Sequence, residues 1–318
     1  MNRFRWLTVC VAMGCGVAAW GQKIELKVNY EPGPYVMTQT MAMDMTVNVA
    51  DQTVKNQMNM VTVMDMSVGK ADADTNREIK VTFRQMKVDM SSGGKVFMKF
   101  DSAVDAESKD PMARMYNAMI GKTLSMTLDT TGKASNLKGM DELFSAMVDA
   151  LPGEADESMK ANMKGIGNSI YEGFSQSGVF PDKPVAKGDT WEVDSQLTLP
   201  MGMPMQVRQV NTLKAIKDGV ATVESKAVVK MERDADTKAD AETEAGADTA
   251  TTGGREMNMT IDSTALVTIA TGLAETTTMT QTGTFVMSVG EMEMQMTMDG
   301  EHKITIAKGA YKPAKPTK

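Results

Sequence analysis

Methionine carries the most distinctive chemistry in this sequence. The 318-residue chain has 33 methionines, only 5% aromatic residues and a single histidine, His302. In the stretch Met292-Glu-Met-Gln-Met-Thr-Met298, methionine alternates with polar residues, which is the period of a strand with one apolar face. Shorter alternations recur at 41–45, 58–60, 64–66, 201–205 and 257–259. A thioether is both an adaptable apolar group and a soft metal ligand, so these residues fit a packed core, a binding surface or a metal site.

The first functional interpretation is an apolar ligand, a lipid or a peptide, held against a sheet lined with methionine. Unbranched, polarizable side chains suit surfaces that accept varied apolar partners. The residues expected to contact such a ligand are Met41, Met43, Met45, Met58, Met60, Met64, Met66 and Trp191. The simpler alternative is that the same methionines only fill the core.

The second functional interpretation is a Cu(I) site, because thioethers select Cu(I) over harder ions. Asp299-Gly300 is a hairpin signal, and a three-residue loop there places Met298 opposite His302. Met296, Met298 and His302 would then converge on one metal, with Trp191 as a cap through a cation–π contact.

Catalytic motifs are missing from the sequence. There is one histidine, and both cysteines, Cys10 and Cys15, fall in the first 21 residues. No nucleophile elbow, phosphate-binding glycine loop or paired-histidine motif occurs. We therefore expect a protein that is not an enzyme and that has no cofactor, apart from the Cu(I) alternative.

The N-terminus resembles an export signal. Arg3 and Arg5 precede an apolar run from Trp6 to Ala18, which is too short to span a bilayer, and cleavage after Gly21 leaves Gln22 first. This predicts a periplasmic or extracellular protein without a transmembrane span. The alternative is a lipoprotein anchored through Cys15. The excess of 41 acidic over 34 basic residues argues against nucleic acid as a partner, and the sequence leaves the oligomeric state open.

Long alternating segments predict strands on both sides of a helical middle. Strands are expected at 23–30, 36–49, 57–68, 79–90 and 95–101, and again at 191–199, 205–216, 219–231, 256–269, 273–289 and 292–307. Between them, Asp110-Pro111 starts a helix whose apolar stripe begins at Met112, a second helix carries Leu143 and Phe144, and a third is expected at 154–177.

The predicted fold class is α+β, with long curved antiparallel sheets that form an open, half-barrel-like shape. The predicted organisation is a signal peptide at 1–21, a first antiparallel half at 22–110, a helical middle with a short hairpin at 111–178 and a second antiparallel half at 179–307. The acidic segment 232–255 and the basic tail 308–318 bury too little apolar area to fold and are expected to be disordered.

Three segments resemble a family of uncharacterised exported bacterial proteins, a domain of unknown function of about this length. The likeness lies in Phe180–Trp191, in the hairpin from Leu124 to Gly132 and in the strand opening Gly272–Gly283. It implies a repeated β-rich unit in the cell envelope and no known activity. The long strands are also similar in architecture to the open half-barrels of lipoprotein-carrier proteins, which by analogy implies an apolar ligand.

Overall fold

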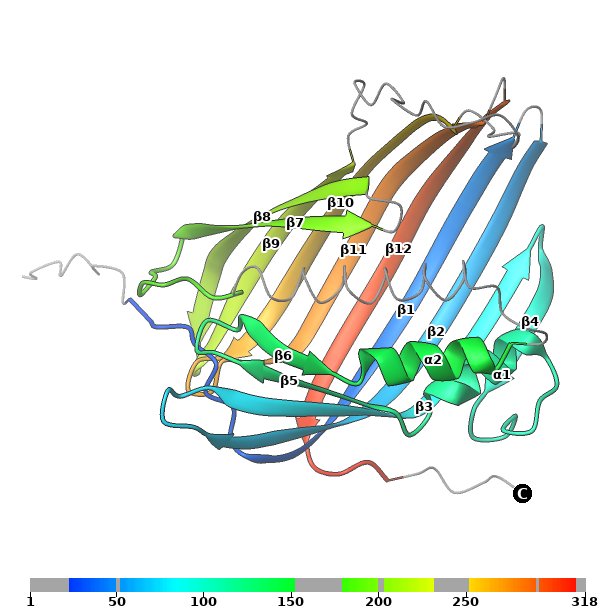
Figure 1. Ribbon diagram of the computed structural model, residues 1–318. Coiled ribbons are helices and arrows are strands. Elements are labelled where there is room, and N and C mark those ends of the chain that lie inside the picture. Colours follow the sequence, from blue (N-terminus) through cyan, green and yellow to red (C-terminus); the bar gives the residue numbers. More distant parts are fainter. Residues whose placement is uncertain are drawn as a thin grey trace, which may run out of the picture.

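The structure, a computed structural model, describes residues 23–49, 52–151, 179–199, 203–231, 252–289 and 292–312. Within these residues, twelve antiparallel strands form one open sheet with the order β6-β5-β3-β2-β1-β12-β11-β10-β9-β8-β7, and β4 pairs with β3 beside this path (Figure 1). The predicted curved, half-barrel-like antiparallel architecture is confirmed. The two predicted runs of strands form a single sheet, because β1 pairs with β12 along fifteen residues.

The strands are long, as the alternating segments predicted. The first run consists of β1 (Gly33–Val49), β2 (Gln52–Ala71), β3 (Arg77–Ser92), β4 (Lys95–Asp101), β5 (Thr123–Leu128) and β6 (Ala134–Lys138). The second run consists of β7 (Thr190–Leu199), β8 (Met203–Lys217), β9 (Val220–Met231), β10 (Thr252–Thr268), β11 (Leu273–Val289) and β12 (Met292–Lys308).

The two faces of the sheet differ in chemistry. Because side chains alternate between faces, the register places Met45 of β1, Met298 of β12 and Gly283 of β11 on one side, in a row across three strands. We call this side, which carries the odd-numbered residues of β1, the methionine face. The opposite side carries residues such as Asp44 and Asp299, and we call it the polar face.

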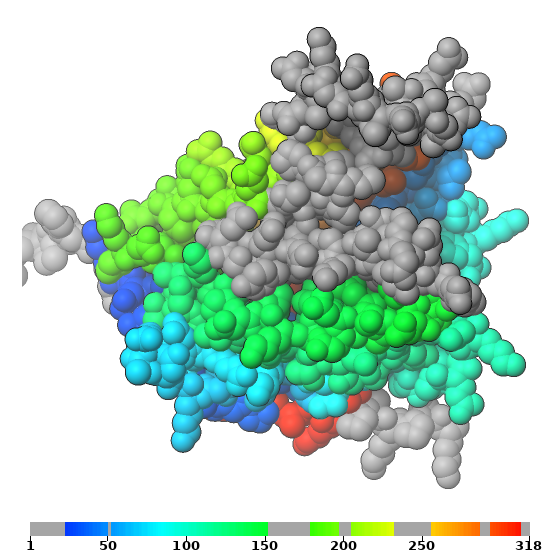
Figure 2. Space-filling view, in the orientation of Figure 1, coloured from blue at the N-terminus to red at the C-terminus, as the bar shows by residue number. Residues whose placement is uncertain are grey.

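Part of the methionine face is covered by a second layer. The sheet curls at β3, so that β5, β6 and the helices α1 (Pro111–Met119) and α2 (Met140–Asp149) lie in front of the long strands (Figures 1 and 2). The predicted start of α1 is confirmed, since the Asp110 carboxylate accepts a hydrogen bond from the Ala113 amide at 3.0 Å. No helix in the described ranges has the length and apolarity needed to cross a membrane.

Three buried clusters hold the layers together. One lies beneath the second run and includes Leu213 and Val223. Another joins the curled end of β3 to β1 and β2, with Tyr35, Met64 and Met66 as members. The third packs Val88 against the Ala113 turn of α1. All three lie on the methionine face, so only part of that face is buried as core.

The prediction of a strand at Lys23–Tyr30 is wrong. Its apolar residues Ile24, Leu26 and Val28 are buried as the alternation requires. However, the backbone bonds to separate partners rather than to one strand: Ile24 bridges Val185, the Val28 amide donates to the Thr130 carbonyl, and the Asn29 amide donates to the Thr271 carbonyl. The segment is therefore an extended strap across one end of the sheet.

Two boundaries of the segments predicted to be disordered are also corrected. Residues 252–255, assigned to the acidic segment, begin β10. At the predicted basic tail, Lys308 ends β12 and the Tyr311 amide donates to the Asp65 carboxylate at 3.0 Å. The export signal, the third helix, the acidic residues 232–251 and the final residues 313–318 lie outside the described residues.

Candidate ligand-binding face

The predicted ligand-contacting methionines all lie on the methionine face, but they differ in depth. Met64 and Met66 are each 5% exposed and belong to the buried cluster around Tyr35. The other five are half-buried and keep accessible surface: Met41, Met43, Met45, Met58 and Met60. The set therefore divides into core residues near the curled end and surface residues further along β1 and β2.

The half-buried methionines continue beyond β1 and β2. Cross-strand pairing brings β12, β11 and β10 alongside, and their methionines face the same way. The half-buried members on these strands are Met294, Met296, Met298, Met279, Met257 and Met259. The alternations at 292–298 and 257–259 gave a signal for five of them, whereas Met279 stands alone among threonines and had none. A band of thioethers thus crosses five adjacent strands, a width of roughly 19 Å at 4.8 Å per strand.

Trp191 does not join this band. It shares the face, but β7 is six strand spacings from β1, about 29 Å along the sheet. Its indole Nε1 donates to the Val179 carbonyl at 3.1 Å, and its ring packs against the cluster that contains Leu26 and Leu213. Trp191 therefore closes the core beneath the strap, and the prediction that it contacts the same ligand as Met41 finds no geometric support.

The hairpin register on which the predicted Cu(I) site depended is wrong. Asp299-Gly300 lies inside β12, which runs without a turn from Met292 to Lys308. Met298 and His302 are four residues apart on one face of one strand, about 13 Å, and Met296 is about 20 Å from His302. These three side chains do not converge on one point.

His302 has other neighbours. It pairs with Met41 on β1 and with Met279 on β11, so a thioether flanks the imidazole on each side. Its Nε2 atom is buried, and none of the described residues gives it a hydrogen-bond partner. Burial lowers the pKa of His302, which favours the neutral ring. In the described part of the chain, no three His, Cys, Asp or Glu side chains gather as a site for a harder ion.

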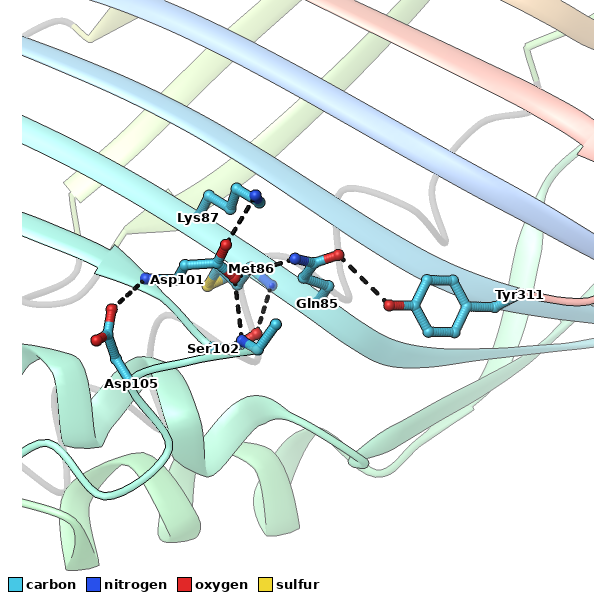
Figure 3. Close-up of polar contacts among 8 residues, drawn as sticks. Gln85, Met86, Lys87, Asp101, Ser102, Asp105 and Tyr311 are labelled. Atoms are coloured by element: carbon cyan, nitrogen blue, oxygen red, sulfur yellow. Dashed lines mark hydrogen bonds and ion pairs between the residues drawn. The ribbon is translucent and has the colours of Figure 1, made fainter. Parts of the chain in front are cut away.

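A polar network on β3 and β4 surrounds the Asp101 carboxylate and shifts its pKa (Figure 3). Asp101 accepts from Lys87 at 2.7 Å and from Gln85 at 3.0 Å, and the Tyr311 hydroxyl donates to Gln85 at 3.4 Å. Partial burial raises the pKa of Asp101, but these hydrogen bonds and the Lys87 charge outweigh it, so that the pKa is lowered. The network ties the C-terminal segment to β3, and we assign it a structural role.

The polar face is hollowed between strands. A depression of about 570 Å³ spans β8 to β11 and is lined by residues of both charges, among them Arg208, Lys226 and Asp262. These residues occupy alternate positions opposite to the methionine face. The mixed charges pair locally, as Lys214 does with Glu224 at 2.9 Å, so the depression presents no single ligand chemistry.

Comparisons with known proteins place the chain in a family but not in a functional class. No curated protein matches it in sequence. A structure of lipovitellin, titled for its lipid–protein interactions, is similar at a TM-score of 0.46 and 9% identity; the likeness covers 90% of this chain but only 27% of lipovitellin. The translocator domain of the autotransporter NalP from Neisseria meningitidis is similar at 0.32 and 7% identity, covering 86% and 88% of the two chains. OccK5 from Pseudomonas aeruginosa is similar at 0.25 and 7% identity, covering 88% and 99%. These values are too low to bear on function.

The sequence resemblance to an uncharacterised β-rich family is confirmed. The matching region begins at the turn before β3 and ends at the start of β11, and so includes both helices and most of the second run of strands. Residues 74–274 match the model of a family of unknown function, DUF6263, and the chain belongs to that family.

Proposed function

We propose that this protein is an exported, noncatalytic binding protein of the cell envelope that holds the acyl chain of a lipid against its methionine face. The observation that carries the proposal is the band of half-buried thioethers across β2, β1, β12, β11 and β10. A contiguous apolar sheet face that keeps accessible surface marks a site for an apolar partner.

Methionine suits this role better than the β-branched residues that strands usually prefer. Val and Ile have restricted side-chain rotamers, whereas methionine has three rotatable bonds and adapts to the shape of its partner. Direct cross-strand pairs such as Met41 with Met60, Met43 with Met58 and Met45 with Met298 form a surface of this kind. Such a surface supports binding of acyl chains that differ in length or unsaturation.

Backbone chemistry favours an acyl chain over a peptide. The strands beneath the band are interior strands, and their backbone hydrogen bonds are used by their neighbours on both sides. A peptide therefore cannot add as a strand at this position. Lying flat on thioethers, it would leave its own N–H and C=O groups without partners, which costs free energy for each buried group. An acyl chain carries no such groups.

The test uses two adjacent positions of β1 that face opposite ways. Met45 lies on the methionine face beside Met298, and Thr46 lies on the polar face beside Thr297; both are half-buried. We expect Met45→Glu to weaken binding of a fluorescent long-chain fatty acid, because the new carboxylate must be desolvated under the chain. Thr46→Glu adds the same charge at the same height and should bind the probe as the parent does.

Two results would count against the proposal. Equal binding by the two glutamate variants would show that the probe does not lie on the methionine face. Failure of the folded parent to bind the probe at all, with far-UV circular dichroism confirming the sheet, would show that the band is only a packing surface.

A further inference from the structure

A single row of donor atoms crosses the middle of the methionine face. The register aligns Met60 of β2 with Met41 of β1, Met41 with His302 of β12, and His302 with Met279 of β11. Directly opposed residues of antiparallel strands have Cβ atoms about 4.5–5.5 Å apart. The Met41 and Met279 side chains therefore stand next to the imidazole, one on each side. Met298 and Met296 cannot do so, because they are four and six residues away from His302 along β12.

The imidazole in this row has an unmet requirement. Its Nε2 is buried and has no hydrogen-bond partner among the described residues. A buried polar atom left without a partner destabilises the fold, so its retention calls for a ligand or another compensation. The positions directly beside it on the same face are Met41, Met279, Gly300 and Ile304, and none of their side chains can donate or accept a conventional hydrogen bond. The polar side chains of Gln39, Thr277 and Gln281 stand at the diagonal positions, and none of them bonds to this nitrogen.

We propose that Met41, His302 and Met279 form a binding site for Cu(I), with Met60 at the end of the row as a further thioether within the same band. A neutral imidazole nitrogen and two thioethers are soft and borderline ligands without charge, the set that selects Cu(I) over Zn²⁺, Mg²⁺ or Ca²⁺. The inference goes beyond acyl-chain binding, because it assigns an inorganic ligand to three residues that a lipid would contact only as apolar surface.

The charge environment is consistent with a monovalent soft ion. The neighbours of His302 along β12 that carry charge, Glu301 and Lys303, point to the polar face. No carboxylate therefore stands beside the imidazole on its own strand to attract a harder divalent ion. The neutral ring is the form of histidine that donates a lone pair to a metal.

Leucine substitutions separate metal binding from packing. Leucine keeps the volume and apolarity of methionine but has no donor atom, and cores usually tolerate this exchange. The experiment titrates the full-length chain with Cu(I) under anaerobic conditions against a competing chromophoric chelator. The test variant is Met41→Leu with Met279→Leu. The matched control is Met296→Leu with Met298→Leu, which removes two thioethers from the same face of β12, away from the row that contains His302.

We expect the parent to bind a single Cu(I) with nitrogen and sulfur scatterers in its X-ray absorption spectrum. The test variant should weaken the affinity by about tenfold or more, since even the loss of an outer-shell partner commonly costs 10–100-fold. His302→Leu should abolish nitrogen coordination, and the control pair should retain the parent affinity. Fatty-acid binding is tested separately with Met45→Glu and Thr46→Glu, neither of which removes a donor atom of the row, so failure of this proposal would not be confused with failure of the lipid proposal.

The proposal is overturned if the parent does not compete with the chelator for Cu(I). It is also overturned if the control pair loses as much affinity as the test pair, because that would indicate diffuse binding to any methionine. Full retention of affinity in His302→Leu would exclude the imidazole and, with it, the site.

Discussion

Truncating methionines at two places on the methionine face distinguishes core from binding surface. Met64 is 5% exposed and packs in the cluster with Tyr35, Val81 and Leu273. Met64→Ala should therefore destabilise the fold by about 3 kcal/mol, in the middle of the 2–5 kcal/mol range for a buried methionine. Met43 is half-buried; it pairs on one side with Gly300, which offers no side chain, and on the other with Met58, which is itself half-buried. Met43→Ala should cost only about 1 kcal/mol, because less apolar area returns to water.

Urea unfolding measures both losses as shifts of the midpoint at constant slope. The affinity for the fluorescent fatty acid should show the opposite order: Met43→Ala should lower it more than Met64→Ala does. A loss of stability at Met43 as large as that at Met64 would refute the reasoning, since it would mean that the half-buried band is as tightly packed as the core. Equal probe binding by the two variants would refute it independently.

Three further predictions test other parts of the structure. Gly272 has φ +68°, and a Cβ there would lie 1.9 Å from the Lys27 carbonyl oxygen. Gly272→Ala should therefore displace the strap and lower the thermal midpoint, and the left-handed backbone alone should cost at least about 1 kcal/mol. An unchanged midpoint would contradict the contact between the strap and Gly272. Burial lowers the pKa of His302 below the ordinary value of 6.5, so the unfolded chain takes up a proton first as the pH falls through that value. The free energy of unfolding should therefore decrease there in the parent but not in His302→Gln. An increase instead would show that the folded protein stabilises the ring as a cation. N-terminal sequencing of the protein purified from its own cells should begin at Gln22, and an acylated Cys15 would instead indicate a membrane anchor.

Local periodicity was sufficient to predict most elements. β11 has the predicted limits, and the start of α1 follows from the Asp110 carboxylate and from Pro111, both of which act within a single helical turn. Period-two alternation also identified the methionine face, because the side of a strand on which a residue lies depends only on its position in the strand.

Features set by distant partners could not be predicted in the same way. The Asp299-Gly300 dipeptide is a hairpin signal by itself, yet here it continues β12, which is paired on both sides. The Gln281 side chain lies over Gly300, 3.0 Å from where a Cβ would be, so a glycine is accommodated there within the strand. Those contacts come from residues far away in sequence, and the register of His302 with Met41 and Met279 depends on the same pairing.

The burial of each methionine likewise could not be predicted from local sequence patterns. Met58 and Met64 read alike in the sequence, but only Met64 lies where β3 curls over the face and brings Phe83 alongside. For the same reason, the alternation at 23–30 correctly indicated buried residues but not the lack of a strand partner. Burial follows from the layer that covers a face, which periodicity does not specify.

Native mass spectrometry of the full protein, purified from its own cells, shows whether the methionine face holds a lipid. We expect the parent to carry a co-purified lipid, released by collisional activation, and Thr46→Glu to carry it too, whereas Met45→Glu should be largely free of it. A known lipid carrier prepared in the same way serves as the control. If it retains its ligand while the parent is detected without any lipid, the methionine face does not bind an acyl chain.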